Sequence, residues 1–233
     1  MRGGYGGRST GSSPSLRAVT SPTDRRFDAV IFDFSGVMVS SAFDALGRHA
    51  AGHGMSEDEF LEFLLGPYSQ DSDHAWHQAE RGEIGILDWA TDTMARAEEA
   101  GMGLDLSFMA GMLGELEVYD VMVEAARSLR ADGYRTSLLT NNIAEGRDSW
   151  RPMLPLDDLF DDVIDSSEVG LRKPNPEIYL LALQRLGGIE PSRSVMLDDH
   201  PGNCAGALAA GMQAIQVRDP AEAVDELLAL LAG

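Results

Sequence analysis

Residues 27–37 read FDAVIFDFSGV, and this stretch decides how the rest of the chain is interpreted. The apolar run at 27–32 is too short for a helix and is typical of a buried strand. The run ends at Asp33, and Gly36 marks a turn directly after it. In open α/β sheets, ligands bind in the crevice at the carboxyl ends of the strands. The stretch therefore predicts a strand that delivers an acidic side chain to a site.

Two further short runs end in small polar or acidic residues. They are residues 134–139, followed by Thr140, Asn141 and Asn142, and residues 194–197, followed by Asp198 and Asp199. Parallel strands present their carboxyl ends at the same edge of a sheet. The three endings together predict one crevice lined by polar groups.

Lys173 is the only lysine in a chain that contains seventeen arginines. It lies in the loop sequence GLRKPNP at residues 170–176. A compact ammonium on a flexible stem enters a small pocket and neutralises an anion there, where the wider guanidinium does not fit. We therefore expect Lys173 to reach the crevice.

These segments resemble, in their order, the four motifs of the haloacid dehalogenase superfamily of aspartate-nucleophile hydrolases. The matching segments are FDFSGV at 32–37, LTNN at 139–142, RKPNPEIY at 172–179 and LDD at 197–199, the last followed by Asn203 and by AAGM at 209–212. Each motif is weak alone, but the ordered set is specific and spans residues 27–218. The Thr-Asn-Asn and Leu-Asp-Asp forms most resemble the branch that contains the amino-terminal phosphatase domain of soluble epoxide hydrolases.

The resemblance implies an α/β fold, a Rossmann-like parallel sheet covered by helices on both faces, with an inserted all-helical cap. The alternation of strands and helices along the chain agrees with this fold. Further strands are predicted at 162–165 and 212–217, and helices at 121–131, 176–186 and 221–231. Asp33 and Thr140 are 107 residues apart, far more than one crossover helix needs. We expect a flexible tail at 1–26, a core formed by 27–39 and 115–233, and a cap at 40–114. Within the cap, helical patterns begin after Ser56 and at Ile86.

Three carboxylates in one crevice repel one another unless a cation lies between them. Oxygen ligands without a nearby His or Cys cluster favour Mg²⁺ over zinc. The resemblance implies that the ligands are Asp33, the backbone carbonyl of Ser35 and Asp199, with Asp198 as a further or outer ligand. It also implies that Asp33 attacks phosphorus and forms an aspartyl-phosphate.

The remaining motif residues correspond to phosphate-binding positions. The resemblance implies that the Thr140 hydroxyl and the Asn141 backbone N–H hold phosphoryl oxygens. Lys173 then neutralises developing charge and holds Asp33 in place. Asn142 is equally compatible with turn formation.

Ser35 departs from the pattern of the family's phosphatases, which carry a second aspartate at this position. That aspartate protonates the leaving alkoxide and later deprotonates water, and such help contributes ~10²–10⁴-fold in rate. A serine hydroxyl is too weak an acid to replace it. The residues considered as substitutes for it are His74, His77, Glu80, Arg81 and His200.

Three functions remain open: a phosphatase on a small phosphorylated metabolite, a hydrolase of another bond such as a dehalogenase, and a catalytically silent binding or regulatory member. Dehalogenating relatives need an arginine early in the cap, and residues 50–80 contain none, although Arg48 and Arg81 flank them. Phosphonate-cleaving relatives use a cap lysine, which this chain lacks. A phosphatase is therefore the first expectation.

Composition limits the partners and the location. The formal charge is −20, and residues 1–26 carry five Arg and one Asp, so the remainder is more acidic still. Such a surface repels nucleic acid and anionic lipid. No apolar run approaches the ~18 residues of a membrane span, and the single Cys204 allows no intramolecular disulfide. We expect a cytoplasmic protein that binds neither nucleic acid nor membrane.

Overall fold

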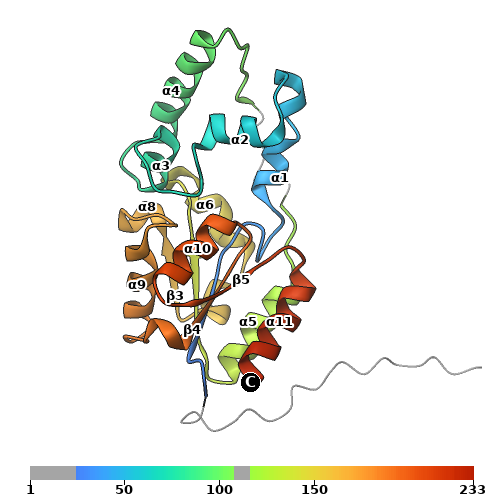
Figure 1. The fold of residues 1–233 in the computed structure, drawn as a ribbon, viewed down its shortest axis with the longest axis vertical. Coiled ribbons are helices and arrows are strands. Elements are labelled where there is room, and N and C mark those ends of the chain that lie inside the picture. Colours follow the sequence, from blue (N-terminus) through green and yellow to red (C-terminus); the bar gives the residue numbers. More distant parts are fainter. Residues whose placement is uncertain (1–24, 108–115) are drawn as a thin grey trace, which may run out of the picture.

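The computed structural model describes residues 25–107 and 116–233, and Figure 1 shows their arrangement. The strands are β1 (Ala29–Phe32), β2 (Arg135–Thr140), β3 (Asp162–Asp165), β4 (Ser194–Asp198) and β5 (Gln213–Gln216). The α-helices are α1 (Ala42–Gly47), α2 (Glu57–Leu65), α3 (Ala75–Glu80), α4 (Ile86–Glu99), α5 (Asp120–Ala131), α6 (Arg147–Trp150), α7 (Leu156–Leu159), α8 (Ser166–Val169), α9 (Pro176–Arg185), α10 (Pro201–Ala209) and α11 (Pro220–Ala232). Short 3₁₀ segments are η1 (Ala50–His53), η4 (Ala144–Gly146), η5 (Arg151–Met153) and η6 (Pro191–Arg193).

The five strands form one parallel sheet in the order β3-β2-β1-β4-β5. Phe32, the last residue of β1, pairs with Leu138 on one side and Leu197 on the other. This register places Asp33 level with Asp198, one residue further along. The strand order thus brings the endings of β1, β2 and β4 together at the middle of the sheet.

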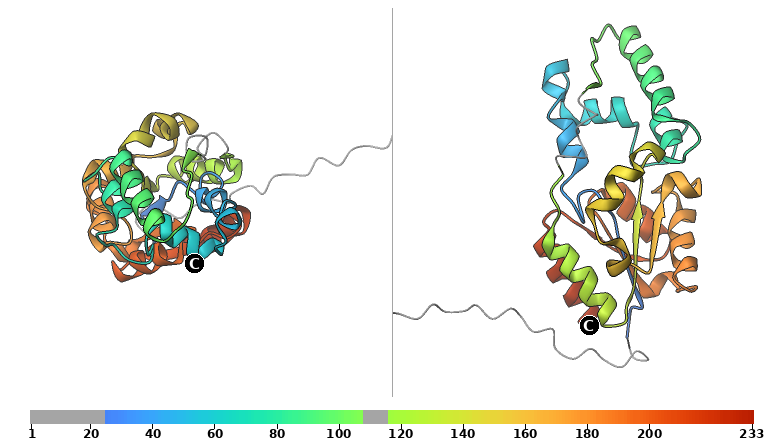
Figure 2. Two further views of the ribbon diagram at one scale, coloured as in Figure 1. Left: turned by 90° about the horizontal axis from the view of Figure 1, so that it is seen from above. Right: turned by 180° about the vertical axis from the view of Figure 1, so that it is seen from behind.

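Alternate residues of the buried strands supply two separate apolar layers, as the period of two requires. Val30 and Phe32 belong to the layer covered by α5 and α11, whereas Ala29 and Ile31 belong to the layer covered by α9 and α10. Figures 1 and 2 show α5 and α11 side by side on one face of the sheet, with α9 on the other. Burial on both faces explains why β1 is a continuous apolar run rather than an alternating one.

Helices α1–α4 form a group of their own beyond the sheet (Figures 1 and 2), and they enclose an apolar cluster that includes Phe60, Leu64 and Trp89. Helix α2 begins with a capping box, in which Ser56 and Glu59 each bond the other's backbone N–H. The two connections to the core run antiparallel. The Ser40 N–H donates to the Glu117 carbonyl at 2.8 Å. The helical group is therefore attached to the core by a paired two-stranded connection.

The prediction of a parallel α/β sheet covered on both faces is confirmed. The predicted strand at 162–165 has these bounds in the structure, and the other strand and helix ends differ from prediction by at most two residues. The described residues do not include most of the predicted tail at 1–26. They also do not include the predicted boundary between cap and core at residues 114 and 115. Among the described residues, none of the helices has the length and apolar character that crossing a bilayer requires.

Candidate active site

Asp33 and Lys173 meet at the end of β1. The Lys173 ammonium lies 2.7 Å from Asp33 Oδ1 and 2.7 Å from Asp198 Oδ2, and its side chain is fully buried. The Phe34 N–H also donates to Asp33 Oδ1, at 2.7 Å. Both of these donors use the same oxygen of Asp33, so Oδ2 is the oxygen left without a donor among the described residues. The expectation that the lone lysine reaches the crevice agrees with this geometry.

Charge pairing keeps Lys173 protonated inside the protein. Burial favours the neutral amine, but the carboxylates of Asp198 and Asp33 outweigh it and raise the pKa of Lys173. The loop that carries the lysine is held by Asn141, whose side-chain amide donates to the Lys173 carbonyl at 3.0 Å and accepts from the Lys173 N–H at 2.8 Å. The ammonium is therefore a fixed positive charge between two strand ends.

Asp198 and Asp199 differ in how they are held. Both oxygens of Asp198 are engaged, because Oδ2 meets Lys173 while Oδ1 accepts from the His200 N–H and the Asn203 amide, each at 3.0 Å. Asp199 instead packs over Gly36, where a Cβ atom would lie 2.0 Å from Asp199 Oδ2. Gly36 also has a φ of +76°, which a side chain would strain. Neither aspartate caps α10, because the N-cap is His200.

The three carboxylates fit a divalent cation. One oxygen each of Asp33, Asp198 and Asp199 lie within 4.8 Å of one another. Burial, and then the neighbouring charge of Asp198, raises the pKa of Asp199 to about 7. Burial likewise raises the pKa of Asp33 well above its ordinary value, against the opposing charge of Lys173. Uncompensated negative charge of this kind, with oxygen donors only, matches the preference of Mg²⁺.

The β2 ending contributes two kinds of residue. Thr140 and Asn141 line a cavity together with Asp33. Asn142 lines the same cavity and also forms the turn, because its side-chain oxygen accepts from the Ile143 N–H at 2.9 Å and its own N–H donates to Ser166 Oγ at 2.9 Å. Of the two interpretations open for Asn142, the structure favours the turn.

Ser35 lies in the same cavity lining but does not replace an acid. Its Oγ accepts a hydrogen bond from the Ala42 N–H at 2.9 Å, at the start of α1. The side chain thereby ties the loop after β1 to the first helix beyond it. Ser35 has a structural contact here in addition to its place beside Asp33.

The residues considered as substitute acids have other contacts. Arg81 pairs with Asp71 and Glu83, and the ring nitrogens Nδ1 of His74 and His200 accept from the backbone at the starts of α3 and α10. His77 is fully buried, and burial together with the Arg172 charge lowers its pKa to about 3. Among the five, only Glu80 lines the cavity beside Asp33. None of them combines a free acidic proton with a position next to Asp33.

An ion pair that the sequence did not indicate joins the helical group to the core. The fully buried guanidinium of Arg172 donates to Glu80 Oε2 at 2.7 Å and lies 4.8 Å above the Tyr68 ring. The Tyr68 hydroxyl donates to the other oxygen of Glu80, at 2.6 Å. Arg172 belongs to the RKPNPEIY segment, but it lies 92 residues from Glu80, and nothing in the sequence pairs the two. The contact holds α3 against the loop that carries the lysine.

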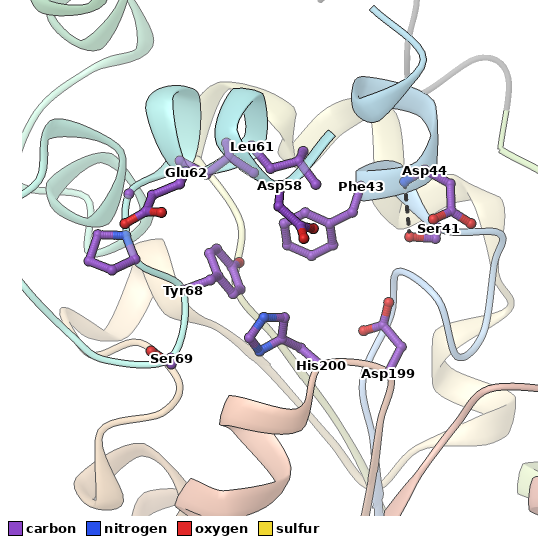
Figure 3. Close-up of a pocket in the computed structure, with 13 residues that line it drawn as sticks. Ser41, Phe43, Asp44, Asp58, Leu61, Glu62, Tyr68, Ser69, Asp199 and His200 are labelled. Atoms are coloured by element: carbon purple, nitrogen blue, oxygen red, sulfur yellow. Dashed lines mark hydrogen bonds between the residues drawn. The ribbon is translucent and has the colours of Figure 1, made fainter. Parts of the chain in front are cut away.

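Two hollows lie between the helical group and the sheet, separated by Phe43, Leu65 and Tyr68, which line both. The smaller one, of about 190 Å³, contains Asp33, Thr140 and Asn141. The larger one, of about 420 Å³, has Asp199 and His200 on its floor, with Asp58 and Glu62 of α2 across from them (Figure 3). The carboxylate cluster is therefore reached from both sides of an aromatic partition.

Sequence comparisons place the chain among hydrolases. Residues 27–211 match the family model described as haloacid dehalogenase-like hydrolase. Acyl-CoA dehydrogenase family member 10 of Mus musculus is 35% identical over 214 residues, which cover 89% of this chain and 19% of that protein. Bifunctional epoxide hydrolase 2 of Rattus norvegicus is 29% identical over 214 residues, covering 84% and 37%. The chain thus spans well under half the length of these two relatives. The resemblance to epoxide hydrolases that the sequence motifs indicate is confirmed.

A shorter match and two solved structures complete the comparison. Glyceraldehyde 3-phosphate phosphatase of Methanothermobacter thermautotrophicus is 39% identical over 92 residues, covering 38% of this chain and 39% of that protein. A family enzyme of Bacteroides thetaiotaomicron in complex with magnesium and inorganic phosphate has a TM-score of 0.57 at 19% identity, covering 83% and 96%. The structure of a dehalogenase has a TM-score of 0.62 at 20% identity, covering 89% and 98%. At this identity the two structures show the shared fold alone.

Proposed function

The chain belongs to the haloacid dehalogenase-like hydrolases, and within this family we propose that it is a metal-dependent phosphatase with Asp33 as nucleophile. One observation carries the proposal: a buried ammonium bonded to two of three clustered carboxylates, next to a cavity lined by Asp33 and Thr140. A relative named a phosphatase supports it.

Asp33 Oδ2 is the attacking atom in this proposal. It bonds to phosphorus while the bond from phosphorus to the leaving oxygen breaks, and that oxygen departs with the electron pair. Water then attacks phosphorus, the bond from phosphorus to Asp33 Oδ2 breaks, and the proton of the water passes to solvent, which releases inorganic phosphate and restores the carboxylate. Lys173 holds Oδ1 throughout and keeps the carboxylate oriented.

Mg²⁺ is the metal that we propose. Asp33, the Ser35 carbonyl and Asp199 would hold it, and Asp198, with both oxygens already bonded, would support it from outside. When bound, the ion quenches the repulsion between the carboxylates and an incoming phosphate. Thr140 and the Asn141 N–H would hold the phosphoryl oxygens.

We further propose that the substrate is a small phosphorylated metabolite of the cytoplasm. The net charge of −20 disfavours nucleic acids and anionic membranes as partners. Hydrolysis at carbon has less support, because the described residues lining the cavity include no Arg, Lys or His to hold the carboxylate of a haloacid. A silent binding module would not require a buried ammonium shared between two carboxylates.

Phosphate release from p-nitrophenyl phosphate and acetyl phosphate, with Mg²⁺ and with EDTA, tests the proposal. We expect turnover that requires the metal. Chloride release from 2-chloropropionate, measured in parallel, identifies the dehalogenase alternative. Hydrolysis of neither class by the full chain would contradict an enzymatic function at this site.

A further inference from the structure

The cavity beside Asp33 is lined mainly by apolar side chains, and its polar lining also includes Ser35, Asn142, Asn203, Tyr68 and Glu80. The buried Trp76 Nε1 and Asn203 Oδ1 form no hydrogen bond with the described residues. Asp33, Thr140 and Asn141 line the end formed by the core. Most of the remaining lining is apolar or aromatic, and includes Phe34, Phe43, Leu46, Leu65, Trp76 and Ile86. Phe43, Leu46, Leu65, Trp76 and Ile86 come from helices α1–α4. The part of a substrate that lies beyond the phosphate therefore meets a largely hydrocarbon surface.

The lining offers no free charge to a charged leaving group. Apart from Asp33, the charged side chain in the described lining is Glu80, and both of its oxygens are engaged, one by the Tyr68 hydroxyl and one by Arg172. A carboxylate, ammonium or second phosphate placed here would lose its water without gaining an unpaired opposite charge, which is unfavourable.

The cavity is small and its aromatic wall is held in place. Its volume of about 190 Å³ lies below the ~300–1,000 Å³ of most ligand pockets, whereas a dry apolar cavity of ~150 Å³ holds one benzene ring. The Tyr68 ring packs edge-on against Phe43 at 4.8 Å and beneath the Arg172 guanidinium. Fixed aromatic walls select a flat ring through offset or edge-to-face contacts.

We propose that the natural substrate carries a compact, uncharged aromatic or similarly apolar group on its phosphate, and that this group occupies the cavity beside Asp33 as the leaving group. The inference rests on the proposed phosphatase function and names the substrate class of that site. It also agrees with Ser35: a phenolate departs with the bonding electrons and needs no proton, so the first step requires no acid at that position.

The test compares phenyl phosphate with 3-carboxyphenyl phosphate, whose leaving groups have nearly equal acidity and differ in charge. We expect kcat/KM with Mg²⁺ to be higher for phenyl phosphate by about 10-fold or more, equivalent to ~1.4 kcal/mol. Glycerol 3-phosphate should be poorer than both. 1-Naphthyl phosphate should be poorer than phenyl phosphate because of its size.

A matched pair of variants locates the effect in the cavity. Ile86 is half-buried at the start of α4, so part of a longer side chain at this position reaches solvent. Ile86→Lys should reduce or reverse the preference for phenyl phosphate by placing an ammonium near the carboxylated ring. Ile86→Met, of similar size and without charge, should keep the neutral preference. Far-ultraviolet circular dichroism checks that both variants fold.

The outcomes separate this inference from the function on which it rests. Release of phosphate from acetyl phosphate together with equal kcat/KM for the two aryl substrates would overturn the substrate class and leave the phosphatase standing. No release from any of these phosphates would overturn both. If Ile86→Lys fails to fold, the comparison of the two aryl phosphates on the wild-type chain still decides.

Discussion

The end of the sheet and the helical face opposite it bury side chains in contrasting ways. At the sheet end, the buried charges are matched to one another: Lys173 bonds Asp33 and Asp198 at 2.7 Å each. Across the cavity, α1–α4 present mainly apolar side chains, and the buried Glu80 is paired back to Arg172 of the core. In the proposed function, the core residues carry the chemistry, and we infer that the helical group selects the substrate by shape and polarity.

This contrast predicts that substitutions at the sheet end change turnover and those in the helical group change stability or preference. The largest effect is expected for Asp33→Asn. Because the nucleophile and a metal ligand are lost together, kcat/KM for p-nitrophenyl phosphate should fall by ~10³-fold or more. The fold should persist, since the change also removes repulsion among the carboxylates.

The control for Asp33→Asn lies at the other end of the same strand. Asp28 pairs with Arg193 near the surface. Asp28→Asn should keep turnover within twofold, because this partly exposed pair lies away from the carboxylate cluster and such pairs contribute little. Similar activity of wild type and Asp33→Asn would contradict the division between chemical and selective regions.

Lys173→Arg should have the next largest effect. The ammonium is fully buried between two carboxylates, and the planar guanidinium does not fit the same two contacts. We expect kcat/KM to fall by about 10²-fold, comparable to the loss of one preorganised electrostatic contact. The reverse exchange at a surface pair, Arg185→Lys opposite Asp162, is the control and should be neutral. Full activity of Lys173→Arg would mean that charge alone suffices at this position.

Ser35→Asp tests the boundary between the two regions, and here a gain is expected. A carboxyl group beside Asp33 could protonate alkoxide leaving groups, so turnover of alkyl phosphates should rise by up to ~10²-fold. For aryl and acyl phosphates, kcat/KM reports the phosphorylation of Asp33 and should change much less, because their leaving groups depart unaided, whereas kcat should rise because the new carboxylate also serves as the base of the second step. Ser35→Ala removes the bond to the Ala42 N–H without adding an acid, and it separates loss of that contact from gain of the proton. An equal change in kcat/KM for alkyl, aryl and acyl phosphates would show that Ser35 does not limit the departure of the leaving group.

The smallest effect concerns His77 in the helical group, where burial has no compensating charge. Its pKa falls to about 3 in the folded chain because of burial and then the Arg172 charge, from an ordinary value of 6.5. Between pH 3 and pH 6.5, the unfolded chain therefore binds a proton at His77 that the folded chain does not bind. The folded state is then most stable above pH 6.5 and becomes less stable as the pH falls toward 3. The free energy of unfolding, measured with urea at pH 7 and pH 5, should decrease more for wild type than for His77→Gln. The difference should be at most about 1.4 kcal/mol per pH unit. Identical slopes would mean that His77 does not bind its proton on unfolding in this range.

The sheet and the core side of the site could be predicted because each depends on local sequence. Short apolar runs that end in Asp33, Thr140 and Asp198 fix the strand ends, and parallel pairing brings them together. The uniqueness of Lys173 in the composition pointed to a buried position. The side-chain contacts of Asn141 with the lysine backbone could not be read, because they depend on how the 170–176 loop folds back.

The helical side of the site was predicted only as helices. Tyr68, Glu80 and Arg172 come from separate segments, and their contact depends on how α3 is oriented against the core. The same holds for the apolar cavity wall, since Phe43, Trp76 and Ile86 each fit an ordinary amphipathic pattern. Periodicity shows which face of a helix is buried, but not which buried residues border a cavity.

The central claim is that Asp33 becomes phosphorylated while the leaving group departs unaided. Ser35 also leaves the second step without a base, so with p-nitrophenyl phosphate and Mg²⁺ the aspartyl-phosphate should accumulate. Rapid mixing should then show a burst of p-nitrophenolate that approaches one equivalent per chain. Borohydride reduction of the quenched reaction, followed by peptide mass spectrometry, should place the modification on Asp33. Steady turnover with no burst and no modified Asp33 would contradict the account.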